Sequence, residues 1–411
     1  MKKAVPIFLT LASLFCLSMF YRSSNAVIAL ELIRDLHLNA ETIGFLGGAF
    51  FYSFSLLQIP MGLLLDRIGP KIIMSSFALI GALGSFLFAF SNSFYAALVG
   101  RVFIGIGMAT MLMGSLKVLT LRFPPERFAT LAGLMITAGA IGSLLSASPL
   151  AFFSSLLGWR ATFIVTGVIT VFLGITLFFL LGGRRKEVES LEQGNVSKEH
   201  QKAKNYIKVI LSSHAFWQIC VMAFFRYGTF ISLQGLWLGV YLMTIQGYSS
   251  IQAGNMLIIM AIGNALGAPI SGRISDKLIP SRKKMVLFGL GVYTLLLLIL
   301  TLTPHFRHPL WYGTIYFFIG FFNGFGTLLY SHVKELFPLS MSATTMAWVN
   351  FFTMSGGAII MSLMGKIIES LSRAGVAPVV GYRITFLICF LSMVASLIYY
   401  AFSKTGDKYH K

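Results

Sequence analysis

The feature that most constrains the fold of this chain is a succession of long apolar runs from one end to the other. About 20 apolar residues span a bilayer as a helix, and about twelve runs reach that length between charged or Pro/Gly-rich breaks. Charged residues make up only 11% of the chain, whereas an ordinary soluble domain carries about 25%. The sequence therefore predicts an all-α integral membrane protein whose main solvent is lipid.

The predicted spans form two groups of six. The first group is Pro6–Ile33, Ile43–Leu65, Ile72–Ser91, Phe94–Leu121, Phe128–Leu157 and Ala161–Leu181. The second group is Ala215–Thr244, Ile251–Ile274, Met285–Thr303, Leu310–Lys334, Met341–Ser370 and Gly381–Phe402. A charged stretch poor in large apolar side chains separates them. We expect a first bundle at 1–182, a linker at 183–213, a second bundle at 214–403 and a tail at 404–411.

The charge distribution predicts the orientation. The formal net charge is +19, and the bases gather in connections that share one side if the spans alternate. Retention of positive loops and attraction to anionic lipid explain this better than nucleic-acid binding. We therefore expect a bacterial inner-membrane protein with both termini and the linker in the cytoplasm.

The cysteines give no sign of a disulfide framework, a metal site or a cofactor. Cys16, Cys220 and Cys389 lie in separate apolar runs, and no CxxC or Cys/His cluster occurs. No catalytic set of residues converges in an aqueous stretch either. We predict a protein that is not an enzyme.

The two halves also repeat local sequence. Phe123-Pro124 recurs as Phe337-Pro338, and the same spacing separates Ala129-Thr130 from Ala343-Thr344 and Gly142 from Gly356. Six spans followed by six related spans form a parallel repeat, which in transporters surrounds a binding site near the bilayer midplane.

Three motifs carry a resemblance to a known family. Gly62-Leu63-Leu64-Leu65-Asp66-Arg67-Ile68-Gly69-Pro70-Lys71 resembles the loop signature of the major facilitator superfamily. A weaker copy runs from Gly272 to Lys277, and Gly100 to Gly107 is similar to the family's Arg-and-Gly motif. The resemblance implies two pseudo-symmetric six-helix bundles that work by alternating access, as a monomer.

The same resemblance implies a set of gating residues that do not touch substrate. These are Gly62, Asp66, Arg67, Gly69, Lys71, Asp276 and Arg101. We expect Gly62 to allow close helix approach and Asp66 to face the positive end of a neighbouring helix. Lys117, near the end of its span, is expected to be solvated or to face lipid.

Two arginines predict the chemistry of the binding site. Arg22 is the only charge between Val5 and Ala29, and Arg226 is the only charge in the seventh span. A charge at mid-bilayer costs at least ~2.5–3.5 kcal/mol, so it needs a partner or a watery cavity. None of the 13 acidic residues lies near the centre of a predicted span. A guanidinium binds a carboxylate or phosphate as a fork, so we expect a cavity that holds a small anion.

This arginine pair resembles that of the organophosphate:phosphate exchangers and related organic-anion transporters, which place arginines in the first and seventh spans. The fifth predicted span has no histidine, which the glycerol-phosphate members use. The resemblance therefore does not extend to a particular sugar phosphate.

Uncharged polar residues within the spans complete the predicted site. At a depth similar to the arginines lie Tyr21, Tyr52, Gln234 and Asn350, which we take as substrate-binding candidates. Other polar residues in the spans are Asn25, Gln58, Thr137, Asn255 and Asn323. Any one of them alone is also explained by a hydrogen bond between helices.

The sequence thus predicts a secondary transporter that carries a small organic anion, either a carboxylate or a phosphorylated compound. The coupling ion is a proton or a counter-anion. One alternative is a proton-coupled efflux pump for amphipathic compounds, which the many Met and Phe side chains favour and the missing central acid disfavours. Another is a membrane sensor on the same scaffold that transports nothing.

Overall fold

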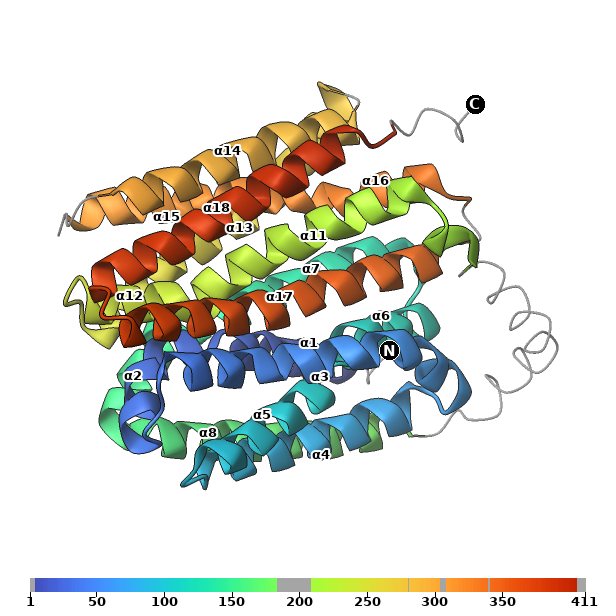
Figure 1. Cartoon of the computed structure of the whole chain (residues 1–411). Helices are drawn as coiled ribbons and strands as arrows, with labels where there is room; N and C mark the ends of the chain where they lie inside the picture. Colours follow the sequence, from blue (N-terminus) through green and yellow to red (C-terminus); the bar gives the residue numbers. More distant parts are fainter. Residues whose placement is uncertain (1–3, 183–207, 280, 304–307, 339–340, 405–411) are drawn as a thin grey trace.

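A computed structural model describes residues 4–182, 208–279, 281–303, 308–338 and 341–404, and these residues form helices and short connections (Figure 1). The first half contains α1 (Ala4–Ser23), α2 (Asn25–Asp35), α3 (Ala40–Arg67), α4 (Pro70–Ala89), α5 (Phe94–Met108), α6 (Met111–Arg122), α7 (Pro125–Leu145) and α8 (Ser148–Leu180). The second half contains α11 (His214–Ser232), η1 (Leu233–Trp237), α12 (Leu238–Thr244), α13 (Ser250–Lys277), α14 (Arg282–Leu302), α15 (Pro309–Gly324), η2 (Phe325–Thr327), α16 (Leu328–Leu336), α17 (Ser342–Arg373) and α18 (Pro378–Ala401).

The described residues confirm the predicted all-α architecture. Among them, eleven helices or helix pairs are long and apolar enough to span a membrane, and the remaining predicted span, Leu310–Lys334, corresponds to α15–η2–α16. The predicted break between the fifth and sixth spans is a kink inside α8 at Gly158, where φ is 79°. Most predicted linker residues, 183–207, and the tail beyond Lys404 lie outside the described residues, so those boundaries stay predictions.

Side-chain caps and prolines fix where the helices begin. Asn39 accepts a hydrogen bond from the backbone N–H of Thr42 at the start of α3, and Ser249 does the same for Gln252 at the start of α13. These caps satisfy N–H groups that no helical carbonyl reaches. Pro70 and Pro378 occupy the first helical turn, where proline's missing N–H costs nothing.

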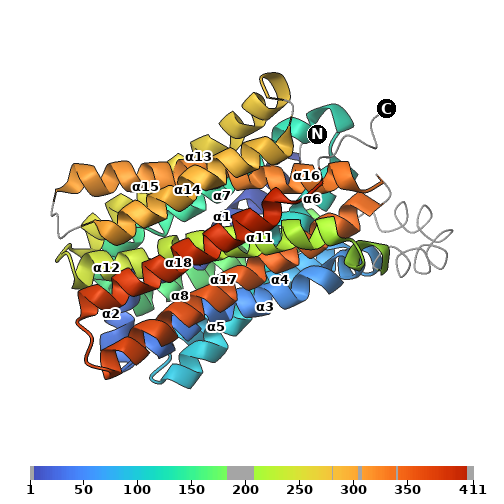
Figure 2. The same cartoon turned by 45° about the horizontal axis from the view of Figure 1, so that its top comes forward.

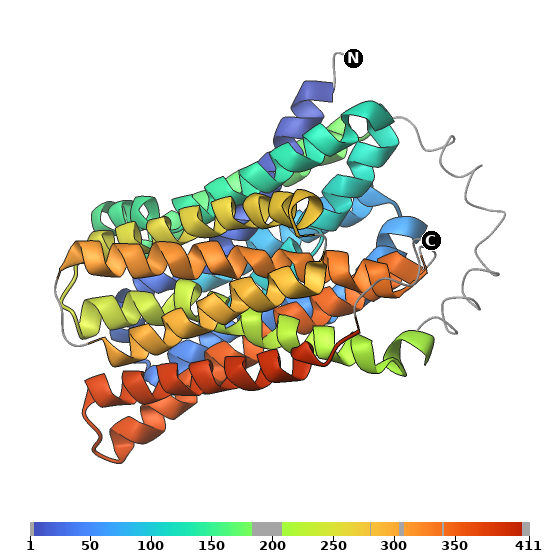
Figure 3. The same cartoon turned by 90° about the horizontal axis from the view of Figure 1, so that it is seen from above.

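The helices run roughly alongside one another, so the molecule has two ends. The Asp35 end carries the α2–α3 connection and lies at the left of Figure 1. The Asp66 end carries the α3–α4 connection, and α1 begins and α18 finishes there. Figure 3 looks onto the second half, with α14, α15 and α18 towards the viewer.

The two halves pack together chiefly through α3 and α17, which lie side by side (Figure 2). Small residues allow this approach near the Asp35 end. A Cβ added at Gly365 would stand 2.4 Å from the carbonyl oxygen of Ala40, and one at Gly48 would stand 2.5 Å from Ser362 Oγ. Without side chains at these points the two backbones come into direct contact.

Two further contacts join the halves at the Asp35 end. Ser148 Oγ, at the start of α8, donates to Asn255 Oδ1 of α13 at 2.5 Å. The backbone N–H of Ala40 donates to Glu369 Oε2 of α17 at 3.2 Å. The structure therefore shows a state in which the halves are closed against each other at this end.

Asp35 ties the end of α2 to α8 within the first half. Its carboxylate accepts from Arg160 Nη1 at 2.7 Å and from Trp159 Nε1 at 3.0 Å. Burial acts to raise the pKa of Asp35, but the hydrogen bonds from Trp159, Arg34 and Arg160 outweigh it and lower the pKa overall. The carboxylate is therefore held ionised, as a fixed partner for these donors.

Candidate functional site

Arg22 projects from the last turn of α1, just before the helix is interrupted at Ser24. Its side chain is 8% exposed. Its Nη1 donates to the hydroxyl of Tyr227 at 3.1 Å, and its guanidinium lies 4.8 Å from the centre of the Phe54 ring. Its Nε is buried and has no partner among the described residues. Arg22 thus reaches across to the second half and keeps an unused donor.

Arg226 stands at the matching place in α11 and is 5% exposed. Its Nη1 donates weakly to Asn323 Oδ1 at 3.4 Å, and Asn323 donates in turn to Asn264 Oδ1 at 2.9 Å. Gly326 makes room for the guanidinium, because a Cβ there would stand 2.4 Å from Arg226 Nε. Like Arg22, Arg226 has a buried Nε without a partner among the described residues.

Tyr227 brings the two arginines into one site. Its hydroxyl contacts Arg22, and its ring centre lies 5.9 Å from the Arg226 guanidinium carbon. Tyr330 of α16 is in electrostatic range of both guanidinium groups. Neither arginine has a carboxylate within ion-pair distance in the described part of the chain. Two buried cations therefore share one polar site whose partners are neutral.

A chain of hydrogen bonds links this site to the other half. The Tyr330 hydroxyl donates to Asn350 Oδ1 at 3.0 Å, and Asn350 Nδ2 donates to Gln58 Oε1 of α3 at 3.0 Å. Gln58 also reaches the carbonyl of Ala109, where α5 gives way to α6. Of the four uncharged candidates, Asn350 is the one that belongs to this network.

The other three candidates lie apart from it. Tyr52 makes a long contact of 3.5 Å with Ser362 between α3 and α17. Gln234 lies in η1 and faces a separate small pocket. The Tyr21 hydroxyl points into the first half, where it donates to Ser85 Oγ at 3.2 Å. The structure does not bring Tyr21 to the arginine pair.

Arg101 is fully buried and supports the interrupted helix beside Arg22. Its Nη1 donates to the carbonyl oxygen of Tyr21 at 3.0 Å and lies 3.4 Å from Ser24 Oγ. Phe50 and Phe88 cover its guanidinium, with ring centres 5.6 and 5.8 Å away. Arg101 thus compensates a carbonyl that the helix break leaves free.

The gating candidates at the Asp66 end form charge pairs within each half. Asp66 pairs with Lys117 of α6, so the expectation that Lys117 is solvated or faces lipid is wrong. In the second half Arg282 pairs with Asp276 at 2.5 Å and with Glu335 at 3.1 Å. The first pair joins the end of α3 to α6, and Arg282 joins the start of α14 to the end of α13 and to α16.

The remaining gating candidates differ in their surroundings. A Cβ added at Gly62 would meet no described atom within 4 Å, so the close helix approach expected there is absent in this state. Gly69 has φ of 89°, a left-handed turn that favours glycine. Lys71 lies over the Phe178 ring at 4.1 Å. The Arg67 side chain is exposed beside Asp66.

Sequence reasoning missed Tyr227, Tyr330 and Asn264 as members of the site. The sequence pattern did point to Tyr227, because this tyrosine follows Arg226 directly, just as Tyr21 directly precedes Arg22. No sequence pattern pointed to Tyr330 or Asn264, because their nearness to the arginines depends on how the helices pack. The resulting arrangement can accept a negatively charged group, since its free donors are cationic and the described residues offer no competing anion.

Long apolar helices in two related halves, with a polar site between them, are the arrangement of a membrane transporter built from a parallel repeat. The sequence model of the Major Facilitator Superfamily matches residues 10–362. The chain belongs to this family, and it is an integral membrane transporter rather than an enzyme.

Relatives and solved structures agree with this assignment. The "Probable L-galactonate transporter" of Escherichia coli K12 is 27% identical over 66% of this chain and 62% of its own length. The "Probable galactarate/D-glucarate transporter GarP" of Escherichia coli K12 is 23% identical over 92% of this chain and 91% of its own. A bacterial homolog of the lysosomal transporter Spinster, in an inward-facing and occupied conformation, has a TM-score of 0.76 at 17% identity, covering 97% of this chain and 96% of its own. A D-xylose-proton symporter has a TM-score of 0.75 at 13% identity, covering 98% of both chains.

Proposed function

We propose that this protein moves a small organic anion across the bacterial inner membrane by alternating access, and that Arg22 and Arg226 bind the anion. The observation that carries the proposal is the pair of buried guanidinium groups, at matching places in the two halves, whose hydrogen-bond partners are neutral. An anion between them would supply the charge that both arginines lack.

The names of the relatives support a carboxylate as the anion. Galactonate and galactarate transporters carry sugar acids, and a transporter for tartrate also matches this chain at 25% identity. Asn323 and Tyr227 would then receive the uncharged part of the substrate, since each contacts a guanidinium group, and Tyr330 and Asn350 would continue the hydrogen-bond network beside them.

The positions of the acidic residues bear on how transport is coupled. The described acids sit at the two ends of the molecule, such as Asp35 and Glu369 at one end and Asp66 and Glu335 at the other. A proton would then enter on the substrate itself, or the exchange of a second anion would drive transport. We also propose that both termini face the cytoplasm, which puts the Asp66 end there, and that one chain suffices for transport.

The proposal is tested by uptake into proteoliposomes of phosphate, sugar phosphates, and mono- and dicarboxylates. Arg22→Lys and Arg226→Lys keep the charge but lose the fork, so each should lower kcat/KM about ten- to a hundredfold, the factor for a lost charge-assisted hydrogen bond. Arg34→Lys is the matched control, because Arg34 is exposed at the end of α2.

Three outcomes of this experiment distinguish the two-arginine anion transporter from an efflux pump and from a sensor. If both lysine variants transport the wild-type substrate unchanged, the two-arginine site is wrong. Transport of amphipathic cations in place of anions would support the efflux alternative. Binding of a ligand without any flux would support the sensor.

A further inference from the structure

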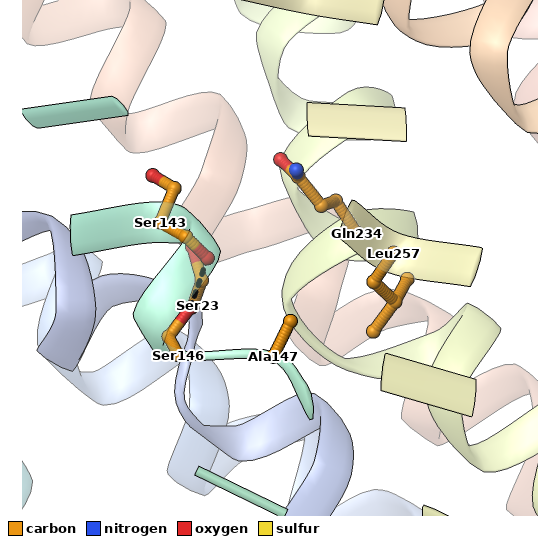
Figure 4. A pocket seen from close by; sticks show the side chains of 6 residues that line it. All are labelled: Ser23, Ser143, Ser146, Ala147, Gln234 and Leu257. Carbon is orange, nitrogen blue, oxygen red and sulfur yellow. Dashed lines mark hydrogen bonds between the residues drawn. The ribbon is translucent and has the colours of Figure 1, made fainter. Parts of the chain in front are cut away.

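A small polar pocket lies between the halves, beside the arginine pair but apart from the network around it. Ser23, Ser143, Ser146, Ala147, Gln234 and Leu257 line a space with room for about one water-sized group. Figure 4 shows the serines of the first half on one side of this space and Gln234 and Leu257 of the second half on the other. Any group held there would touch both halves at once.

Three interruptions of regular helix meet at this pocket. Ser23 ends α1, Ser146 and Ala147 connect α7 to α8, and Gln234 lies in the π-helical turn η1. Irregular backbone is tolerated inside a membrane protein where it lines a cavity. Such π-helical turns also occur often at functional sites. The irregular geometry thus marks the pocket as more than a packing gap.

The pocket offers hydrogen bonds but no charge. Gln234 is 8% exposed and Ser23 is 6% exposed, and their side chains make no hydrogen bond with any described residue. Ser146 Oγ donates to the carbonyl of Ser143 at 2.8 Å and keeps its acceptor sites. A buried amide and hydroxyls without partners can both donate to and accept from a hydroxyl group. They suit a neutral hydroxyl better than a carboxylate, which can only accept.

The pocket is within reach of an anion held by the arginines. Ser23 follows Arg22 directly, and a Cβ at Gly235, next to Gln234, would stand 3.7 Å from the Arg22 carbonyl oxygen. Along the helix, Tyr227 and Gln234 are separated by roughly 10 Å at 1.5 Å per residue. A linear acid of six carbons is of comparable length, and the proposal below requires one molecule to contact both places.

We propose that this pocket is a subsite that recognises a hydroxyl group of the transported acid, with Gln234 and Ser23 as its specificity-determining residues. The inference rests on the proposed function. It narrows the substrate class to hydroxylated carboxylates and assigns the discrimination to residues other than the arginines. A site built to bind a hydroxyl rejects an analogue that lacks it, because its own polar groups are then left unpaired.

The test compares acids of equal charge and carbon number that differ only in hydroxyl groups. Tartrate is paired with succinate, and galactarate with adipate, in proteoliposome uptake by the wild type, Gln234→Leu and Ser23→Ala. Gln218→Leu is the matched control, because Gln218 is also a buried glutamine, in α11, and its side chain bonds the carbonyl of Tyr399 instead.

In the wild type we expect kcat/KM for the hydroxylated acid to exceed that for its partner by at least about tenfold. Gln234→Leu should lower this ratio about tenfold and Ser23→Ala about threefold, while Gln218→Leu leaves it unchanged. Uptake of the acid without hydroxyls should stay within about twofold in every variant, which also shows that the variants fold.

A wild-type ratio near one, or a ratio that Gln234→Leu leaves intact, overturns the subsite and leaves the two-arginine proposal standing. The pocket would then hold water only. If the wild type transports no carboxylate at all, the proposed function fails, and this inference fails with it.

Discussion

The arginines of this protein differ in what surrounds each guanidinium. Arg160 bonds Asp35, and Arg282 bonds Asp276 and Glu335, so acids already satisfy their charges. Arg22 and Arg226 instead face a phenol, an amide and aromatic rings. Neutral hydrogen-bond partners do not offset most of the free energy that burying a charge costs. Within the site between the halves, Arg22 and Arg226 are therefore the residues on which an incoming anion has the largest effect.

Asn350 links Tyr330 of the second half to Gln58 of the first half through the two ends of its amide. Asn350→Leu removes the acceptor for Tyr330 and the donor for Gln58. Leaving such buried groups unpaired costs about 1–3 kcal/mol. We expect the free energy of unfolding, measured in detergent by denaturant titration, to fall by that amount.

The double variant Gln58→Met with Asn350→Leu provides the control. It removes both amides, so its cost should be smaller than the sum of the two single costs. Strictly additive costs would show that the two side chains do not stabilise each other.

The positions of glycines determine how closely helices α3 and α17 pack. Gly365→Val would put a side chain 2.4 Å from the Ala40 carbonyl, and a backbone oxygen cannot turn away as a flexible side chain can. The helices must then separate at the Asp35 end. Overpacking of this kind costs typically about 1–3 kcal/mol, and we expect uptake in proteoliposomes to fall about tenfold.

The matched control is Gly291→Val in α14, where an added Cβ would meet no described atom within 4 Å. Both variants add the same β-branched side chain to a helix, so the loss of helix propensity is shared. Equal uptake by the two variants would mean that the α3–α17 contact does not matter for transport.

Alternating access requires the seam at the Asp35 end to open, which is a prediction about the whole molecule. Ser148 and Asn255 touch across this seam. Cysteines at both positions should form a disulfide when oxidised, because their side chains already meet. We expect the crosslink to hold the halves closed at this end, to abolish most uptake, and to be reversed by a reducing agent.

The single variants Ser148→Cys and Asn255→Cys should keep uptake under the same oxidation. The crosslinked fraction is read from the mobility of the protein after cleavage in the intervening linker. A fully crosslinked sample that transports at the wild-type rate would show that this seam stays closed throughout the cycle.

From the amino-acid sequence alone we predicted the long apolar helices, the repeat of the two halves, and Arg22 and Arg226 as isolated charges within apolar runs. These features are local or periodic, because the cost of exposing polar backbone or charge to lipid acts on each segment separately. The break near Gly158 and the lack of acidic residues near the centres of the predicted spans are also visible in the local sequence.

Which side chains meet depends on how the helices pack in three dimensions. The packing of the helices places Tyr330, Asn350 and Gln58 in one network and directs the Tyr21 side chain into the first bundle. It also pairs Lys117 with Asp66. Each contact joins helices that are far apart in sequence. Which face of a helix meets which neighbour depends on the packing of many small and large residues together, and that information does not lie in any single stretch of the chain.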